Sequence, residues 1–146
     1  HVRSRRQRQM CIRDRIIDAP CSSTGTIRKN PDILIRNNII DLTKLQRIQQ
    51  ELLKNAASNI KVGGYLMYIV CSLEKEEGED IVNKFLKTNT NFQILNLNQY
   101  IQDLKKTLKL NTIGYLKFLP NDFKVHQNDH LNGNNGFFSA ISERKF

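Results

Sequence analysis

The sequence lacks several features that would assign it to common protein classes. None of its apolar runs approaches the roughly 18 residues that a membrane-spanning helix needs. The opening residues are basic but contain no apolar core, so they do not resemble a secretory signal. We find no internal repeat, no CxxC pair and no histidine cluster of the kind that holds a metal. These absences favour a cytoplasmic domain without a metal site or a membrane segment, and 146 residues are enough to bury a core.

Cysteine is scarce, because the chain contains only Cys11, Cys21 and Cys71. An odd count without an export signal argues against a disulfide framework. The thiols are then either buried apolar side chains, the commoner role of a cytosolic cysteine, or reactive groups. The residues around each thiol must decide between these two roles.

Charge is unevenly distributed along the chain. The formal net charge is +9, but residues 1–15 contain six arginines and one aspartate and so account for more than half of it. The mildly basic remainder is compatible with an RNA partner without requiring one. Residues 1–15 are rich in Arg and Gln, whereas the rest prefers Lys, Asn and Ile. We interpret 1–15 as a non-native or adaptor-derived leader, with a basic RNA-binding arm as the alternative, and 16–146 as the domain.

The hydrophobic pattern after the leader predicts strands that alternate with helices. The expected elements are a strand at 15–19, a loop at 20–40, a helix at 43–60, a strand at 65–70, a helix at 72–87, and strands at 92–97, 115–119 and 137–142. This order indicates an α/β sheet with right-handed crossovers. Gly63-Gly64 stands between a helix and a strand, so it is expected to be a turn and not a cofactor loop.

Both long helices have capping residues at their expected starts. Asp41 and Thr43 can cap the first helix, and Ser72 can cap the second. Acidic side chains in the first turns of the second helix would be favoured by its dipole: Glu74, Glu76 and Glu77. A helix that starts at Ser72 would also bring positive potential to Cys71, which the acidic side chains would partly oppose.

Two cysteines follow the two clearest strands. The stretch DAPCSSTG occupies residues 18–25 and comes directly after the first strand, while Cys71 directly follows the second. Ligands of parallel sheets collect just beyond the carboxyl ends of the strands. If the two strands are parallel neighbours, Cys21 and Cys71 open onto one cleft.

These motifs resemble those of the RNA 5-methylcytosine methyltransferases, the family of the bacterial ribosomal RNA enzyme often called Sun or Fmu. DAPCSSTG with the following IRKNPD resembles the fourth motif of that family, and YIVCSLEKEEGE resembles its sixth, with Val70 where Thr is more usual. NGFFSAI resembles its closing motif, with Asn135 in place of Asp. The resemblance covers about residues 16–146. It implies the C-terminal half of a Rossmann-like S-adenosylmethionine-dependent methyltransferase sheet, mostly parallel with an antiparallel last strand.

The resemblance also implies roles for individual residues. Cys71 would be the nucleophile that adds to carbon 6 of a cytosine, and Cys21 would assist release of the methylated product. Asp18 would contact the methionine part of S-adenosylmethionine. Arg28 and Lys29 would touch RNA phosphate, although solvated surface charge is an equal alternative. No Gly-rich cofactor loop precedes Asp18, so we expect a fragment that is inactive alone.

Alternative functions stay open at this point. Within the family, transfer RNA is the alternative substrate to ribosomal RNA. A non-catalytic RNA-binding module would need the cysteines only for packing, but the chain has no aromatic stacking stripe. A thiol hydrolase would need a histidine near Cys71, and His126 and His130 stand in a polar segment far along the chain.

Overall fold

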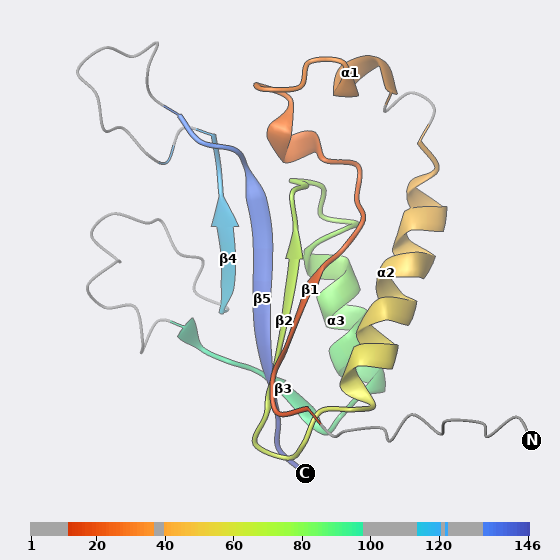
Figure 1. Cartoon of the computed structure of the whole chain (residues 1–146), viewed down its shortest axis with the longest axis vertical. Coiled ribbons are helices and arrows are strands. Elements are labelled where there is room, and N and C mark those ends of the chain that lie inside the picture. The colour runs from red at the N-terminus through yellow and green to blue at the C-terminus, as the bar shows by residue number, and fades with distance from the viewer. Residues whose placement is uncertain (1–11, 37–39, 98–113, 121, 123–132) are drawn as a thin grey trace, which may run out of the picture.

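The computed structural model describes residues 12–36, 40–97, 114–120, 122 and 133–146. These residues form a twisted sheet with two long helices beside it (Figure 1). The strands are β1 (Arg15–Asp18), β2 (Tyr65–Val70), β3 (Phe92–Ile94), β4 (Tyr115–Phe118) and β5 (Phe137–Arg144). The helical elements are a 3₁₀ turn (Thr24–Thr26), α1 (Ile33–Arg36), α2 (Leu42–Ala57) and α3 (Glu79–Thr88).

The sheet combines a parallel pair with an antiparallel last strand. Its order is β1-β2-β5-β3, and β4 also pairs with β5. β1 and β2 are parallel, whereas β5 is antiparallel to β2, β3 and β4. The other four described strands therefore run in one direction and β5 runs against them, which confirms the expected α/β sheet with an antiparallel last strand. Three of the four described strand pairs are still antiparallel, because one edge of β5 pairs with β2 and its other edge pairs with β3 and β4.

The hydrophobic core lies between the sheet and the two long helices. Side chains alternate along β2, so every second residue is buried against the helices, namely Leu66, Tyr68 and Val70. Helix α2 contributes Leu53, Ala56 and Ala57, and α3 contributes Ile81, Val82 and Phe85. The rings of Phe85 and Phe92 pack with centroids 5.3 Å apart. This one-sided packing holds β1 and β2 side by side and thereby positions the loops that follow them.

The start of α2 follows the expected capping pattern. Asp41 adopts an extended backbone conformation, and its carboxylate accepts hydrogen bonds from the amides of Thr43 and Lys44. The helix ends three residues earlier than expected, and the chain then turns at Gly63, whose φ of 76° suits glycine. The crossover between β1 and β2 is therefore the helix that the hydrophobic period predicted.

The expected start of the next helix at Ser72 is wrong. Helix α3 begins at Glu79, and residues 71–78 form bends and turns. The hydroxyl of Ser72 does accept a hydrogen bond from the amide of Glu74, but its other partners are Ser22 and Thr24 of the loop after β1. These tertiary bonds hold the segment away from helical geometry. No helix begins at Cys71, so the expected help from a helix dipole is also wrong.

Part of the segment that we separated as a leader contacts the domain. Ile12 forms a parallel bridge with Ile60, and the carboxylate of Asp14 accepts a hydrogen bond from the amide of Tyr65. The non-native origin of residues 1–15 stays a prediction. Cys11, His126, His130 and the expected insertion at 98–113 lie outside the described residues. Within the described ranges, no helix is long and apolar enough to cross a membrane.

Candidate active site

Two cysteines meet at the carboxyl ends of β1 and β2. Asp18 is paired with Ile69 in the parallel ladder, and the amide of Ala19 donates to the carbonyl of Ile69. The two strands thus end side by side, and the chain leaves each of them into a loop that carries a thiol. The sulfurs of Cys21 and Cys71 lie 3.4 Å apart, and both thiols are free. The sequence-based prediction that parallel strands bring the two cysteines together is therefore confirmed, and a cleft that both thiols open onto stays a prediction.

All three sequence motifs converge on Gly25. The amide of Gly25 donates to the carbonyl of Cys71 at 3.0 Å, and the carbonyl of Gly25 accepts from the amide of Gly136 at 2.7 Å. A β-carbon at Gly25 would lie only 2.0 Å from the carbonyl oxygen of Gly136. A side chain at residue 25 is therefore excluded, because the backbones of the loop after β1, the loop after β2 and the start of β5 approach too closely there.

Hydroxyl groups join the loop after β1 to the loop after β2. The Oγ atoms of Ser22 and Ser72 are 3.2 Å apart, and the same separation joins Oγ1 of Thr24 to Ser72. Thr24 also accepts a hydrogen bond from the amide of Leu73 at 3.0 Å. Ser22 and Ser72 are almost completely buried, so these bonds satisfy groups that water does not reach. The two loops consequently form one hydrogen-bonded unit.

The two thiols have opposite protonation preferences. The hydrogen bond with Cys21 is the main cause that lowers the pKa of Cys71 to about 6, and the Ser23 hydroxyl lowers it further. Burial and the nearby charge of Asp18 oppose this shift. The pKa of Cys21 is raised, first by the same bond with Cys71 and then by burial. One proton is therefore shared by the pair near neutral pH: Cys21 is the donor, and Cys71 is the thiolate that accepts it.

Ser23 is held in an unusual backbone conformation beside both sulfurs. Its φ of 62° and ψ of 23° are left-handed, and it is the one non-glycine residue with positive φ among those described. This conformation costs roughly 1–2 kcal/mol for a residue with a β-carbon. It brings Oγ to 3.4 Å from the sulfur of Cys71 and 3.9 Å from that of Cys21. The strain thus coincides with a contact between the hydroxyl and the thiol pair.

Glu77 is a buried site residue that the sequence-based analysis missed. Its side chain is completely buried, and its carboxylate accepts hydrogen bonds from the amide and the hydroxyl of Ser22 and from Nε2 of Gln49. The sequence placed Glu77 with Glu74 and Glu76 in the first turns of a helix, where the helix dipole favours acidic side chains. Nothing in the local run of acids distinguishes the one glutamate that turns inward, so only the tertiary structure identifies it.

The remaining predicted site residues lie at the surface of the same end of the sheet. Asp18 is exposed, and its carboxylate has no hydrogen bond to any residue in the described ranges. Arg28 donates to the carbonyl of Gly133 at 3.0 Å, and Lys29 is exposed. Asp18 thus has a free acceptor next to the thiols, whereas Arg28 also contacts the segment before β5.

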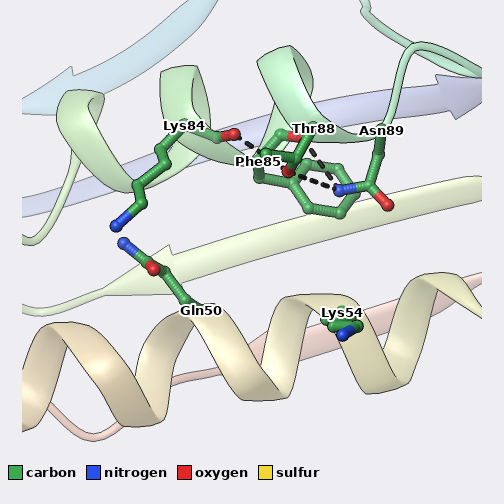
Figure 2. Close-up of a pocket in the computed structure, with 6 residues that line it drawn as sticks. All are labelled: Gln50, Lys54, Lys84, Phe85, Thr88 and Asn89. Atoms are coloured by element: carbon green, nitrogen blue, oxygen red, sulfur yellow. Dashed lines mark hydrogen bonds between the residues drawn. The ribbon is translucent and has the colours of Figure 1, made fainter.

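A separate hollow lies between the helices and contains none of the predicted site residues. It measures about 350 Å³ and is lined by Gln50, Lys54, Lys84, Phe85, Thr88 and Asn89 (Figure 2). Thr88 and Asn89 donate to backbone carbonyls in the last turn of α3, so their polar groups complete the helix end. Among the described residues we also find no group of His, Cys, Asp or Glu that could hold a metal ion. The thiol pair is therefore the candidate active site.

The sheet is shared with solved methyltransferase-like structures. The crystal structure of PH0851 aligns with a TM-score of 0.69 and 31% identity over 89% of this chain and 26% of that protein. A methyltransferase homolog protein from Pyrococcus horikoshii aligns with a TM-score of 0.53 and 26% identity over 91% of this chain and 39% of that protein. The fold is thus that of a larger class of methyltransferase-like proteins.

Comparison with known sequences shows the family to which the chain belongs. Residues 2–141 match the model of the 16S rRNA methyltransferase RsmB/F family, and the chain belongs to that family. The probable ribosomal RNA small subunit methyltransferase B of Bacillus subtilis is 31% identical over 90% of this chain and 28% of that protein. The tRNA (cytosine(34)-C(5))-methyltransferase of Drosophila melanogaster is 40% identical over 51% of this chain and 10% of that protein. The chain therefore spans less than a third of either relative.

Proposed function

We propose that the chain forms the thiol-bearing C-terminal part of the catalytic domain of an RNA (cytosine-5)-methyltransferase, with ribosomal RNA as substrate. The observation that supports this most directly is the pair of sulfurs 3.4 Å apart, with the pKa of Cys71 lowered and that of Cys21 raised by their hydrogen bond. Residues 16–146 would be the catalytic part, and residues 1–15 would have another origin. The chain belongs to the family but covers only 28% of the Bacillus subtilis relative, which agrees with its being part of a larger enzyme. We place the protein in the cytoplasm, where free thiols persist.

Cys71 acts as the nucleophile in this proposal. Carbon 5 of cytosine is a poor nucleophile, and the reaction needs a covalent step to activate it. The Cys71 thiolate adds to carbon 6, its electron pair forms the carbon–sulfur bond, and the electrons of the 5,6 double bond make carbon 5 electron-rich. A pKa of about 6 keeps this sulfur ionised at neutral pH, which is the reactive form.

Asp18 is the residue in this chain that we assign to the cofactor. S-adenosylmethionine supplies an electrophilic methyl group on a sulfonium. The exposed carboxylate of Asp18 has acceptor capacity left among the described residues and lies at the carboxyl end of β1, the end of a parallel strand where ligands usually bind. It would accept hydrogen bonds from the methionine part of the cofactor. The charge of Asp18 also acts on Cys71, which agrees with a cofactor placed next to the nucleophile.

Cys21 assists release of the methylated base. A base removes the proton from carbon 5, the electron pair restores the 5,6 double bond, and the bond from carbon 6 to the Cys71 sulfur breaks. Cys71 then leaves as a thiolate. The S–H group of Cys21 stabilises that thiolate through the same hydrogen bond that lowers the pKa of Cys71. Protonated Cys21 therefore favours elimination over a persistent adduct.

RNA would approach over the loop after β1. Arg28 and Lys29 are exposed in the turn that follows the 3₁₀ element, and cations at such an edge contact phosphate without reading sequence. The target base must leave its stack to reach a half-buried sulfur. Transfer RNA is the second candidate substrate, and the identity with the Drosophila tRNA enzyme favours it. Methyl transfer to purified ribosomal and transfer RNA decides between them.

The test is made in the full-length enzyme with labelled S-adenosylmethionine. Cys71→Ala should abolish methyl transfer, because carbon 5 is never activated. Cys21→Ala should still permit addition and methylation but slow release, so a covalent protein–RNA adduct should accumulate on a denaturing gel. An adduct that accumulates in Cys71→Ala and not in Cys21→Ala would reverse the two roles. Full activity of both variants would refute the proposed chemistry.

A further inference from the structure

The buried carboxylate of Glu77 is hydrogen-bonded to both residues that flank Cys21, to Ser22 directly and to Pro20 through Gln49. Glu77 accepts hydrogen bonds from the amide of Ser22 at 2.9 Å and 3.2 Å, one to each oxygen, and from the Ser22 hydroxyl. Gln49 donates through Nε2 to Glu77 at 3.1 Å and to the carbonyl of Pro20 at 2.9 Å. Pro20 and Ser22 flank Cys21 directly. The two residues next to the thiol are thus attached to one buried acceptor, one of them through Gln49.

The backbone of residues 76 and 77 is itself fixed by hydrogen bonds from β2 and α2. Its carbonyl accepts a hydrogen bond at 2.7 Å from the hydroxyl of Tyr68, a core residue of β2. The carbonyl of its neighbour Glu76 accepts from Gln46 of α2 at 2.9 Å. A carboxyl group without exposed surface needs hydrogen-bond donors to remain buried, and the donors here come from the Cys21 loop and α2. The side chain of Glu77 therefore connects α2 with the Cys21 loop, and its backbone carbonyl connects the same residue with β2.

We propose that Glu77 is the positioning residue of the thiol pair: by binding Ser22 and, through Gln49, Pro20, it fixes Cys21 against Cys71 and sets the distance between the sulfurs. The catalytic meaning of that distance rests on the function proposed above. The geometric claim itself needs neither RNA nor cofactor. Glu77 has no contact with the reacting sulfur of Cys71 among its hydrogen bonds, so it acts through the loop.

Negative charges near the two thiols also affect their pKa values, and this effect has the opposite sign from a loss of positioning. Asp18 acts on Cys71 from the end of β1, while Glu77 and Tyr68 lie behind Cys21. The charge of Glu77 raises the pKa of Cys21, and that of Asp18 raises the pKa of Cys71. Removal of the Glu77 charge alone should therefore lower the pKa of Cys21 and should not raise that of Cys71. Loss of positioning should have the opposite effect on Cys71, because its thiolate loses the donor that stabilises it.

The test uses Glu77→Gln in the full-length enzyme, with Glu76→Gln as the matched control. Gln at residue 77 keeps one acceptor and adds an NH₂ group that meets the donors of Ser22 or Gln49, so the Cys21 loop should shift. Glu76 is exposed one residue earlier, and its replacement removes the same charge without touching the loop. The measurement is the rate of Cys71 alkylation by iodoacetamide against pH, followed by peptide mass spectrometry.

The midpoint of the Cys71 profile should lie at about 6 in the parent chain and in Glu76→Gln. In Glu77→Gln it should rise by about 1 pH unit or more, because the donor from Cys21 is lost. Circular dichroism establishes that each variant is folded. An unchanged or lowered midpoint in folded Glu77→Gln would overturn the proposal, since it would leave only the effect of charge.

A second variant keeps the proposal testable if Glu77→Gln does not fold. Gln49→Met retains the carboxylate and a side chain of similar length but releases the carbonyl of Pro20. Its Cys71 midpoint should rise in the same direction by a smaller amount, and an unchanged midpoint in the folded variant would also overturn the proposal. The methyl-transfer assay on the full-length enzyme is separate. Absence of methyl transfer in that assay would refute the proposed function. The alkylation profiles of Cys71 would still decide the role of Glu77.

Discussion

The loop after β1 and the loop after β2 each carry a cysteine, and the pKa values of the two thiols are shifted in opposite directions. Cys21 and Cys71 lie 3.4 Å apart, yet the pKa of Cys21 is raised and that of Cys71 is lowered to about 6. Ser23 lies nearer to Cys71, and the negative charge of Glu77 lies behind Cys21. Two identical thiols can share one proton unequally because the groups behind each sulfur differ.

The two loops also differ in how they are held. The Cys21 loop is attached by side chains to Glu77 and Gln49, whereas the Cys71 loop is attached mainly by the backbone of Gly25 and the hydroxyl of Thr24. Each loop is therefore held by residues that lie outside it. The site forms only when β1, β2 and β5 have assembled, so changes that separate the loops should have larger effects than changes at one sulfur.

The largest expected effect comes from Gly25→Ala, which pushes the loops apart. The new β-carbon would lie 2.0 Å from the carbonyl oxygen of Gly136 and 3.0 Å from that of Cys71. Because both obstacles are backbone atoms, we expect a loss of roughly 3 kcal/mol or more in the free energy of unfolding. Urea denaturation followed by circular dichroism measures it.

Gly63→Asn is the matched control for this substitution. Gly63 has a φ of 76°, and a β-carbon added there would meet nothing within 4 Å. Asn tolerates the left-handed region, so the loss should be about 1 kcal/mol or less. A loss below about 1 kcal/mol for Gly25→Ala as well would contradict the close junction of the two loops.

The next largest effect is expected from Cys21→Ala, measured at the sulfur of Cys71. Without its donor, the Cys71 thiolate is destabilised, and its pKa should rise from about 6 toward the ordinary value of 9.0. Alkylation of Cys71 at pH 7 should then slow roughly tenfold, because most of the sulfur becomes protonated. The parent should lose reactivity only as the pH falls through about 6, whereas the variant should already be slow at neutral pH.

Cys21→Ser distinguishes a hydrogen-bond effect from the loss of a neighbouring group. The serine hydroxyl can still donate to Cys71, so the midpoint should rise less than in the alanine variant. Equal midpoints for Cys21→Ser, Cys21→Ala and the parent would show that the sulfurs do not share a proton.

The smallest expected effect comes from Ser23→Ala. The Ser23 hydroxyl lowers the pKa of Cys71 less than Cys21 does, so its removal should raise the alkylation midpoint by about half a unit. Ser23→Gly should give the same midpoint but a higher free energy of unfolding, by about 1 kcal/mol, because glycine relieves the left-handed conformation. Different midpoints for the two variants would mean that Ser23 acts through the backbone and not through its hydroxyl.

Local patterns in the sequence were sufficient for most of the elements and for the thiol pair. The apolar run at 65–70 and the Asp41 cap are local signals, and both elements occur where they were expected. The pairing of Cys21 with Cys71 follows from the rule that parallel strands joined by one helix end at the same edge. Strand ends were less accurate, since β3 stops at Ile94 and β5 continues to Arg144.

Only the tertiary structure decided what surrounds the two sulfurs. Ser72 has the side chain of a helix cap, but contacts with Ser22 and Thr24 engage it before a helix can start there. Glu77 has the side chain of an exposed helical acid, but donors from two distant elements draw it into the core. By itself the sequence determined which strands and thiols exist, because periodicity and turn chemistry act over a few residues. Burial and hydrogen-bond partners depend on contacts 28 to 55 residues apart. One such contact, the hydrogen bond between Cys21 and Cys71, shifts the pKa values of the two thiols in opposite directions.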